Sequence, residues 1–103
     1  MKNDILEWLQ RWYLQNCNGD WEHGYGVFIE TLDNPGWLIK INLEDTQYEN
    51  IEVDKYKRQN KNNEDDWAHY KIENKIFQGA CGPLNLIEIL QYFKDIIDKQ
   101  KPN

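Results

Sequence analysis

The sequence predicts an α+β fold of two layers, in which an N-terminal helix and a C-terminal helix pack on a four-stranded antiparallel β-meander. Three observations predict it. Apolar residues recur at helical spacing at both ends of the chain, they alternate with polar residues in between, and the connections between strands are short. With 103 residues, 40% of them hydrophobic, the chain has the size of one domain spanning residues 1–103.

The first helix is expected from Asn3 to about Asn16. Asp4 and Glu7 have the spacing of a capping box, and Gly19 is the expected left-handed stop after the helix. The apolar face of this helix is formed by Ile5, Trp8, Leu9, Trp12 and Tyr13.

A β-hairpin is expected next. From Tyr25 the apolar period changes to two, residues 33–36 (Asp-Asn-Pro-Gly) carry the signal of a type II turn, and residues 37–43 alternate again. A weaker third strand is expected at about 50–57, residues 59–66 read as a loop, and Trp67–Glu73 reads as the fourth strand.

The glycine-containing run 78–83 is expected to break the chain before the second helix. Asn85 and Glu88 are spaced as the capping box of that helix, and Lys99 suits its C-terminal dipole. Its apolar face is formed by Leu86, Ile89, Leu90, Phe93 and Ile97.

Both helices are expected to cover the same sheet face, which leaves the other face open. The alternative is one helix on each face, which would bury Phe28, Leu38 and Trp67. The covered face would be made by Val27, Ile29, Ile39, Ile41, Ile51, Val53, Tyr70 and Ile72. The open face would mix apolar groups with acid and present Phe28, Glu30, Leu38, Lys40, Asn42, Glu52, Asp54, Trp67 and His69.

The formal charge of −6 is unevenly distributed. Residues 20–54 carry nine acidic side chains against Lys40 alone, whereas residues 55–75 carry six basic and four acidic side chains. Such acidity argues against nucleic acid or an anionic membrane as a partner and favours a basic partner or a cation; its simplest alternative is a solvated surface that maintains solubility. No apolar run approaches a membrane span, and charges interrupt the N-terminal segment, so we expect a cytoplasmic protein.

The residues give little indication of catalysis. The chain contains no serine, so a Ser-His-Asp triad is excluded, and its two cysteines, Cys17 and Cys81, are expected to be reduced thiols. No zinc, EF-hand or nucleotide-binding spacing occurs, so we expect no metal or cofactor. The alternative left open is a small ligand-binding or enzymatic domain that uses the cluster of Asp20, Glu22 and His23. Self-association through the open sheet face also remains open, and the sequence does not set the oligomeric state.

Several segments together resemble a known family. They are residues 5–13 (ILEWLQRWY), 18–23 (NGDWEH), 30–37 (ETLDNPGW), the pair Asp66-Trp67 and residues 77–83 (FQGACGP). In these segments the chain resembles the immunity protein 53 family nearly from end to end, although Cys81 departs from the glycine usual at its position. The resemblance implies a cytoplasmic, non-catalytic inhibitor that binds and neutralises a cognate toxin of a bacterial polymorphic toxin system, and it implies no catalytic residues.

Charge and resemblance together predict a basic toxin domain, such as a nuclease, as the partner. Trp21 and Trp67 are expected to be exposed aromatic anchors, because aromatic side chains are enriched at binding hot spots. The predicted contact residues are Trp21, Glu22, Phe28, Glu30, Leu38, Glu44, Asp45, Glu49, Glu52, Asp54 and Trp67.

Overall fold

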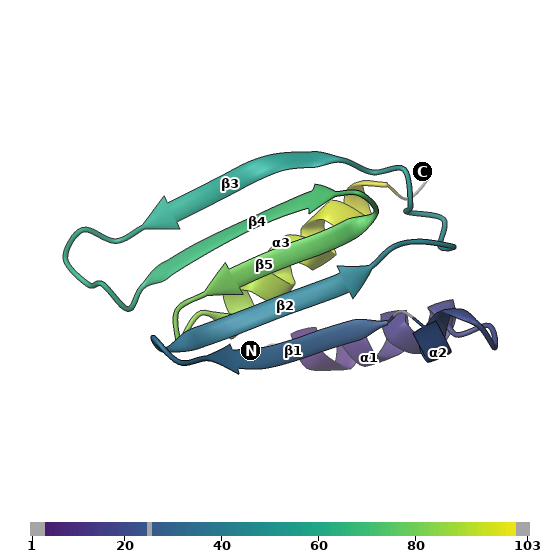
Figure 1. The fold of residues 1–103 in the computed structure, drawn as a ribbon, viewed down its shortest axis with the longest axis horizontal. Coiled ribbons are helices and arrows are strands. Elements are labelled where there is room, and N and C mark those ends of the chain that lie inside the picture. Colours follow the sequence, from purple (N-terminus) through teal and green to yellow (C-terminus); the bar gives the residue numbers. More distant parts are fainter. Residues whose placement is uncertain (1–3, 25, 101–103) are drawn as a thin grey trace.

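The computed structural model describes residues 4–24 and 26–100 and has an α+β fold, as predicted. The sheet is antiparallel and has five strands. The helices lie behind it in the view of Figure 1. Three helices are described: α1 (Ile5–Asn16), a single turn α2 (Trp21–Gly24), which was not predicted, and α3 (Leu86–Lys99). The strands are β1 (Val27–Leu32), β2 (Gly36–Asn42), β3 (Val53–Gln59), β4 (Trp67–Glu73) and β5 (Ile76–Cys81).

The predicted four-stranded meander is wrong, because the sheet has a fifth strand and the order β1-β2-β5-β4-β3. β5 lies in the centre, between β2 and β4, so β3 does not pair with β2 but forms the far edge. Residues 78–83 were expected to break the chain, yet residues 78–81 complete this central strand. Gly79 belongs there because a Cβ atom would stand 3.2 Å from the Phe77 ring and 3.3 Å from Ile89 of α3. The glycine lets α3 approach the sheet.

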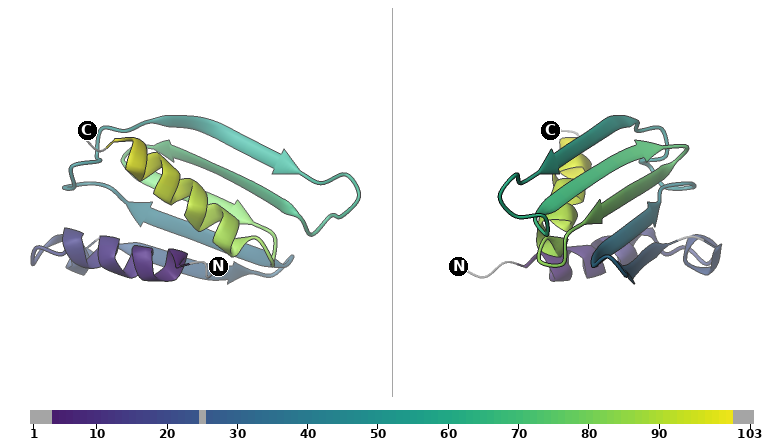
Figure 2. Two further views of the ribbon diagram at one scale, coloured as in Figure 1. Left: turned by 180° about the vertical axis from the view of Figure 1, so that it is seen from behind. Right: turned by 60° about the vertical axis from the view of Figure 1, so that its left-hand side comes forward.

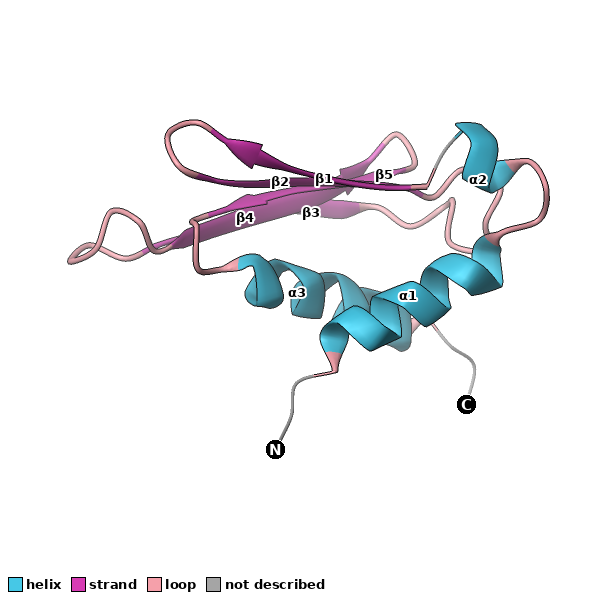
Figure 3. Cartoon of the chain, turned by 90° about the horizontal axis from the view of Figure 1, so that it is seen from below, coloured by secondary structure: helices cyan, strands magenta, loops and turns pink. Residues whose placement is uncertain are grey.

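Both α1 and α3 cover the same face of the sheet, as expected (Figure 3). α3 runs diagonally behind the central strands, and α1 runs along the β1 side of the sheet (Figure 2). The register therefore divides the side chains into a covered face and an open face. Ile39, Ile41 and Ile72 on the covered face are at most 2% exposed, whereas Ile29 on the edge strand β1 remains 37% exposed.

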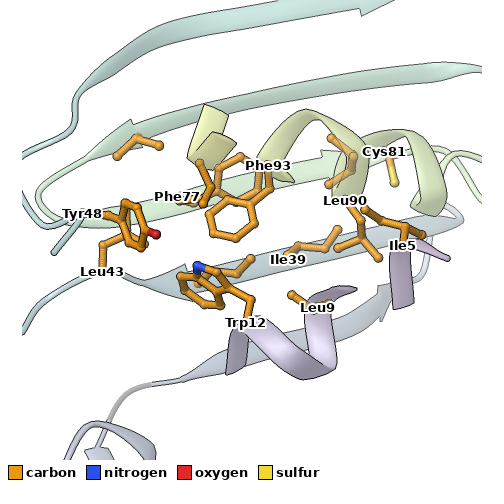
Figure 4. Close-up of a cluster of buried hydrophobic side chains, with 14 of the residues drawn as sticks. Ile5, Leu9, Trp12, Ile39, Leu43, Tyr48, Phe77, Cys81, Leu90 and Phe93 are labelled. Carbon is orange, nitrogen blue, oxygen red and sulfur yellow. The ribbon is translucent and has the colours of Figure 1, made fainter. Parts of the chain in front are cut away.

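The core lies between the sheet and the two helices and is rich in aromatic rings (Figure 4). Trp12 of α1 lies at its centre, with its ring centroid 5.1 Å from that of Phe93 and 5.8 Å from that of Trp21. Burying such rings removes a large apolar area from water, and edge-on ring contacts add to this gain. The indole Nε1 of Trp12 has no hydrogen-bond partner among the described residues.

Neither predicted capping box forms. The side chains of Asp4 and Asn85 make no capping hydrogen bond to their helices. Instead Asn85 Nδ2 donates to Asp66 and Glu88, both of which bind Arg58. Gly19 has a positive φ of 95°, as expected of a left-handed stop, and it lies in the turn between α1 and α2. Asn3 lies outside the described residues.

Candidate functional site

Acidic residues from two distant segments of the chain lie at one end of the molecule. The α1–α2 turn with α2, the loop 43–52 and the beginning of β3 all lie at the same end of the long axis (Figure 1). We call this the acidic end and define it by Asp20, Glu22, Glu44, Asp45, Glu49, Glu52 and Asp54.

Specific contacts hold these segments together. Trp21 of α2 is fully buried, and its indole Nε1 donates to the backbone oxygen of Asn42 at the end of β2 (3.1 Å). Residues 45–48 line a shared hollow with residues 15, 16 and 18 of the α1–α2 connection. The expectation that Trp21 is an exposed anchor is therefore wrong. Trp21 follows a turn in the sequence, and nothing in the sequence indicated that this turn folds over the core.

Buried side chains and hydrogen bonds hold loop 43–52 in place, although it has no regular secondary structure. Leu43 and Tyr48 are buried, and Thr46 Oγ1 donates to the backbone oxygen of Leu43 (2.7 Å) while accepting from the amide of Tyr48 (3.1 Å). Its acidic side chains thus project from a backbone anchored in the core. Asp45 is exposed, and Glu49 accepts a hydrogen bond from the Asp45 amide.

Glu22 has a structural role in the same region. Its carboxylate accepts hydrogen bonds from the backbone amides of Asn18 (2.8 Å) and Gly19 (2.7 Å). Hydrogen bonds from backbone amides, first its own and then those of Asn18 and Gly19, lower the pKa of Glu22. This carboxylate closes the turn before α2, and both of its oxygens are engaged by backbone amides in that turn.

Four of the predicted contact residues share the open face of the sheet. Phe28 pairs with Lys40 and Glu30 pairs with Leu38 across β1 and β2, and Trp67 lies on the same face of β4. Phe28 is 49% exposed, whereas Leu38 and Trp67 are half-buried. Trp67 stacks on His69, with ring centroids 5.5 Å apart.

The open face is richer in lysine than the sequence led us to expect. Lys55, Lys57 and Lys71 lie there beside Lys40. Sequence analysis missed the first three because it counted charge by segment rather than by face, although Lys55 and Lys57 show the two-residue spacing of one strand face. Glu52 and Asp54 lie at the edge of this region and line a hollow of about 320 Å³ with Lys55, Lys71 and Glu73.

The described residues contain no group of three or more His, Cys, Asp or Glu side chains placed to hold a metal ion. Cys81 is fully buried, and this burial raises the pKa of its thiol to about 11. A buried thiol with a raised pKa is unreactive, because the reactive species is the thiolate. Within residues 4–24 and 26–100, no helix is long and apolar enough to cross a membrane.

Comparison with known proteins supports the family resemblance. A family model described as immunity protein 53 matches residues 6–98. No curated protein and no solved structure matches the chain.

Proposed function

The chain belongs to the immunity protein 53 family, and from this we propose that it neutralises a cognate toxin by forming a stoichiometric, non-catalytic complex with it in the cytoplasm. The proposed partner is a basic toxin domain of a bacterial polymorphic toxin system, such as a nuclease. The family does not indicate which surface binds the toxin. The observation that supports a choice is the acidic end, where two segments distant in sequence lie together and contacts with the core hold their backbone.

The acidic end has the properties of a surface that attracts a basic protein. Asp45, Glu52 and Asp54 are exposed, and no ion pair with a described residue neutralises them. Opposite charge on two partners raises the rate of association, and an inhibitor that protects its own cell benefits from fast capture. In this proposal the carboxylates of the acidic end take the place of substrate phosphates in the basic cleft of the toxin.

Among the predicted contact residues, Glu44, Asp45, Glu49, Glu52 and Asp54 belong to this docking surface, and Phe28, Glu30, Leu38 and Trp67 form a second surface on the open face. Trp21 and Glu22 do not belong to either surface; their contacts with Asn42, Asn18 and Gly19 hold the backbone of the acidic end in place. Their substitution is expected to weaken the fold of this end and not a direct contact.

The proposal is tested by affinity capture from the native cell with a tagged copy, followed by mass spectrometry and washes of increasing salt. We expect one stoichiometric partner with a basic domain, whose toxic activity disappears when the purified chain is added in equimolar amount. A captured partner that stays active in the presence of excess chain would refute the neutralising role.

A further inference from the structure

The open sheet face carries lysines that make no ion pair within residues 4–24 and 26–100. Among the described residues, no acidic side chain pairs with Lys40, Lys55 or Lys57, whereas Lys71 Nζ lies 2.7 Å from Glu73. Lys75, by contrast, forms an ion pair at the acidic end, where its Nζ lies 3.8 Å from a carboxylate oxygen of Glu49. Unpaired lysines on a strand face are available to an external anion.

The strand register places two of these lysines at a hollow: Lys55 lines it, and Lys57 lies beside it as the cross-strand partner of His69. Leu38, Ala80 and His69 form one row across β2, β5 and β4, and Lys57 continues the row on β3. The neighbouring row contains Lys40, Gln78 and Lys71. The hollow has a volume of about 180 Å³ and is lined by Leu38, His69, Gln78 and Ala80, with Lys55 and Lys71 also on its wall.

The size of the residue at the floor explains the hollow. Ala80 is 6% exposed, and it lies between the longer side chains of Leu38 and His69 on the adjacent strands. Burial, followed by the charges of Lys55 and Lys57, lowers the pKa of His69. The imidazole is therefore neutral at neutral pH, and the positive charge of the site belongs to the lysines.

We propose that this hollow on the open face binds an acidic segment of the partner protein, with a carboxylate held by Lys55 and Lys57 and apolar side chains lying on Leu38 and Trp67. The inference rests on the proposed function and gives the complex a second contact of opposite charge to the acidic end. Two contacts of opposite sign fix the orientation of a partner better than one, because a reversed docking would place like charges together.

An acidic protein segment fits this face better than a nucleic acid. Glu30 and Glu73 lie on the same face as the lysines, and the chain as a whole carries −6. A nucleic acid presents a long row of phosphates and needs a basic field along its length, whereas one peptide carboxylate needs only the few lysines around the hollow.

The test is a titration of the isotope-labelled full chain, followed by NMR, with a short synthetic peptide rich in glutamate and leucine. The matched probe is the same peptide with glutamine in place of every glutamate. We expect the amide signals of Leu38, His69 and Ala80 to shift with the glutamate peptide and not with the glutamine peptide. The double variant Lys55→Gln/Lys57→Gln should bind about tenfold more weakly, because it removes two charge-assisted contacts. The double variant Lys61→Gln/Lys99→Gln, with the same change in net charge away from the hollow, should bind like the wild type.

Several results would overturn the inference. They are equal shifts with both peptides, shifts confined to other residues, unchanged binding in the Lys55→Gln/Lys57→Gln variant, or tighter binding of a single-stranded oligonucleotide at the same signals. Concentration-dependent shifts of these signals in the chain alone would also overturn it, because a second copy would then cover the face.

Failure of this inference can be distinguished from failure of the proposed function. If the wild type and the Lys55→Gln/Lys57→Gln variant neutralise the captured toxin with the same affinity, the inference fails and the proposed function stands. If the wild type does not neutralise the toxin, the proposed function fails irrespective of the peptide result.

Discussion

His69 is the single side chain that reports most directly on the electrostatics of the open face. Burial lowers its pKa from the ordinary value of 6.5, and Lys55 and Lys57 lower it further. We expect Lys57→Gln to raise the pKa of His69 while leaving it below 6.5, because burial persists. An NMR titration of the imidazole signals measures this. Lys61→Gln in the loop after β3 is the control, and an equal pKa of His69 in both variants would show that Lys57 does not act on His69.

Asp66 predicts how stability responds to acid. Its carboxylate accepts hydrogen bonds from Arg58 Nη2 (2.6 Å), Asn60 and Asn85, and these lower its pKa from 3.8 to about 2, with the bond from Arg58 the largest cause. Because the folded pKa lies below the unfolded one, the stabilisation is complete above pH 3.8 and is lost as the pH falls towards 2.

Urea unfolding at a series of pH values between 3.8 and about 2 tests this. The free energy of unfolding of the wild type should fall over that range, and Asp66→Asn should make the fall shallower. Asp65→Asn removes a neighbouring carboxylate that takes no part in the Arg58 ion pair, so it is the control. Parallel curves for the wild type and Asp66→Asn would contradict the role of Asp66.

At the scale of elements, the connection between β5 and α3 depends on close backbone contact with Asp65 and Trp67, at the beginning of β4. Gly82 donates from its amide to the backbone oxygen of Trp67 (2.9 Å), and a Cβ atom at Gly82 would collide with the backbone oxygen of Asp65. We expect Gly82→Ala to destabilise the protein by about 1–3 kcal/mol, since the backbone must shift. Gly24→Ala is the control because nothing lies within 4 Å of its Cβ position. Equal thermal unfolding of the two variants would contradict this.

The turn between β4 and β5 shows why one strand could not be predicted from sequence. β4 and β5 join through Asn74 and Lys75, both with positive φ. Tight hairpin turns of this kind usually carry glycine, so Asn74-Lys75 gave no hairpin signal. The glycines near the end of β5 then predicted the end of regular structure, although Gly79 lies within the strand and allows the close approach of α3. The bounds of β4, by contrast, follow directly from its alternation.

The candidate site was predictable only in part, for a related reason. Alternation correctly placed Phe28, Glu30, Leu38 and Trp67 on the open face, because a strand's period assigns its residues to faces. It could not place Trp21, because the burial of a residue in an irregular segment depends on what packs over it. Nor could it assemble the lysine face, which needs the register between β3, β4 and the missed β5.

At the scale of the whole molecule, carboxylates and lysines form two surfaces that meet at the beginning of β3, where Glu52 and Asp54 line a hollow with Lys55. The acidic end gathers the carboxylates of residues 20–22 and 44–54, while Lys40, Lys55 and Lys57 lie on the open face. Packing of the hydrophobic core does not explain this distribution of charge, because both groups of charged side chains lie outside the core. A surface that carries opposite charges in two places imposes an orientation on an approaching partner during encounter, which suits the neutralising complex proposed above.

Charge reversal at the two ends of β3 tests the steering role of the acidic end. Glu52 and Asp54 are exposed at its beginning, and Glu64 and Asp65 are exposed in the loop that follows its other end. Glu52→Lys/Asp54→Lys should slow association with the captured toxin about tenfold at low salt, and make the rate less dependent on salt, because long-range attraction governs encounter. Glu64→Lys/Asp65→Lys makes the same change in net charge at the opposite end, so it should slow association much less.

Stopped-flow association at several salt concentrations separates the effect of location from that of total charge. If both variants slow association equally, net charge alone attracts the toxin and the acidic end has no special role. If neither does, electrostatic steering is not part of the mechanism. A loss confined to the Glu52→Lys/Asp54→Lys variant, with dissociation little changed, would place the encounter at the acidic end and leave the residence time of the complex to the buried apolar contacts.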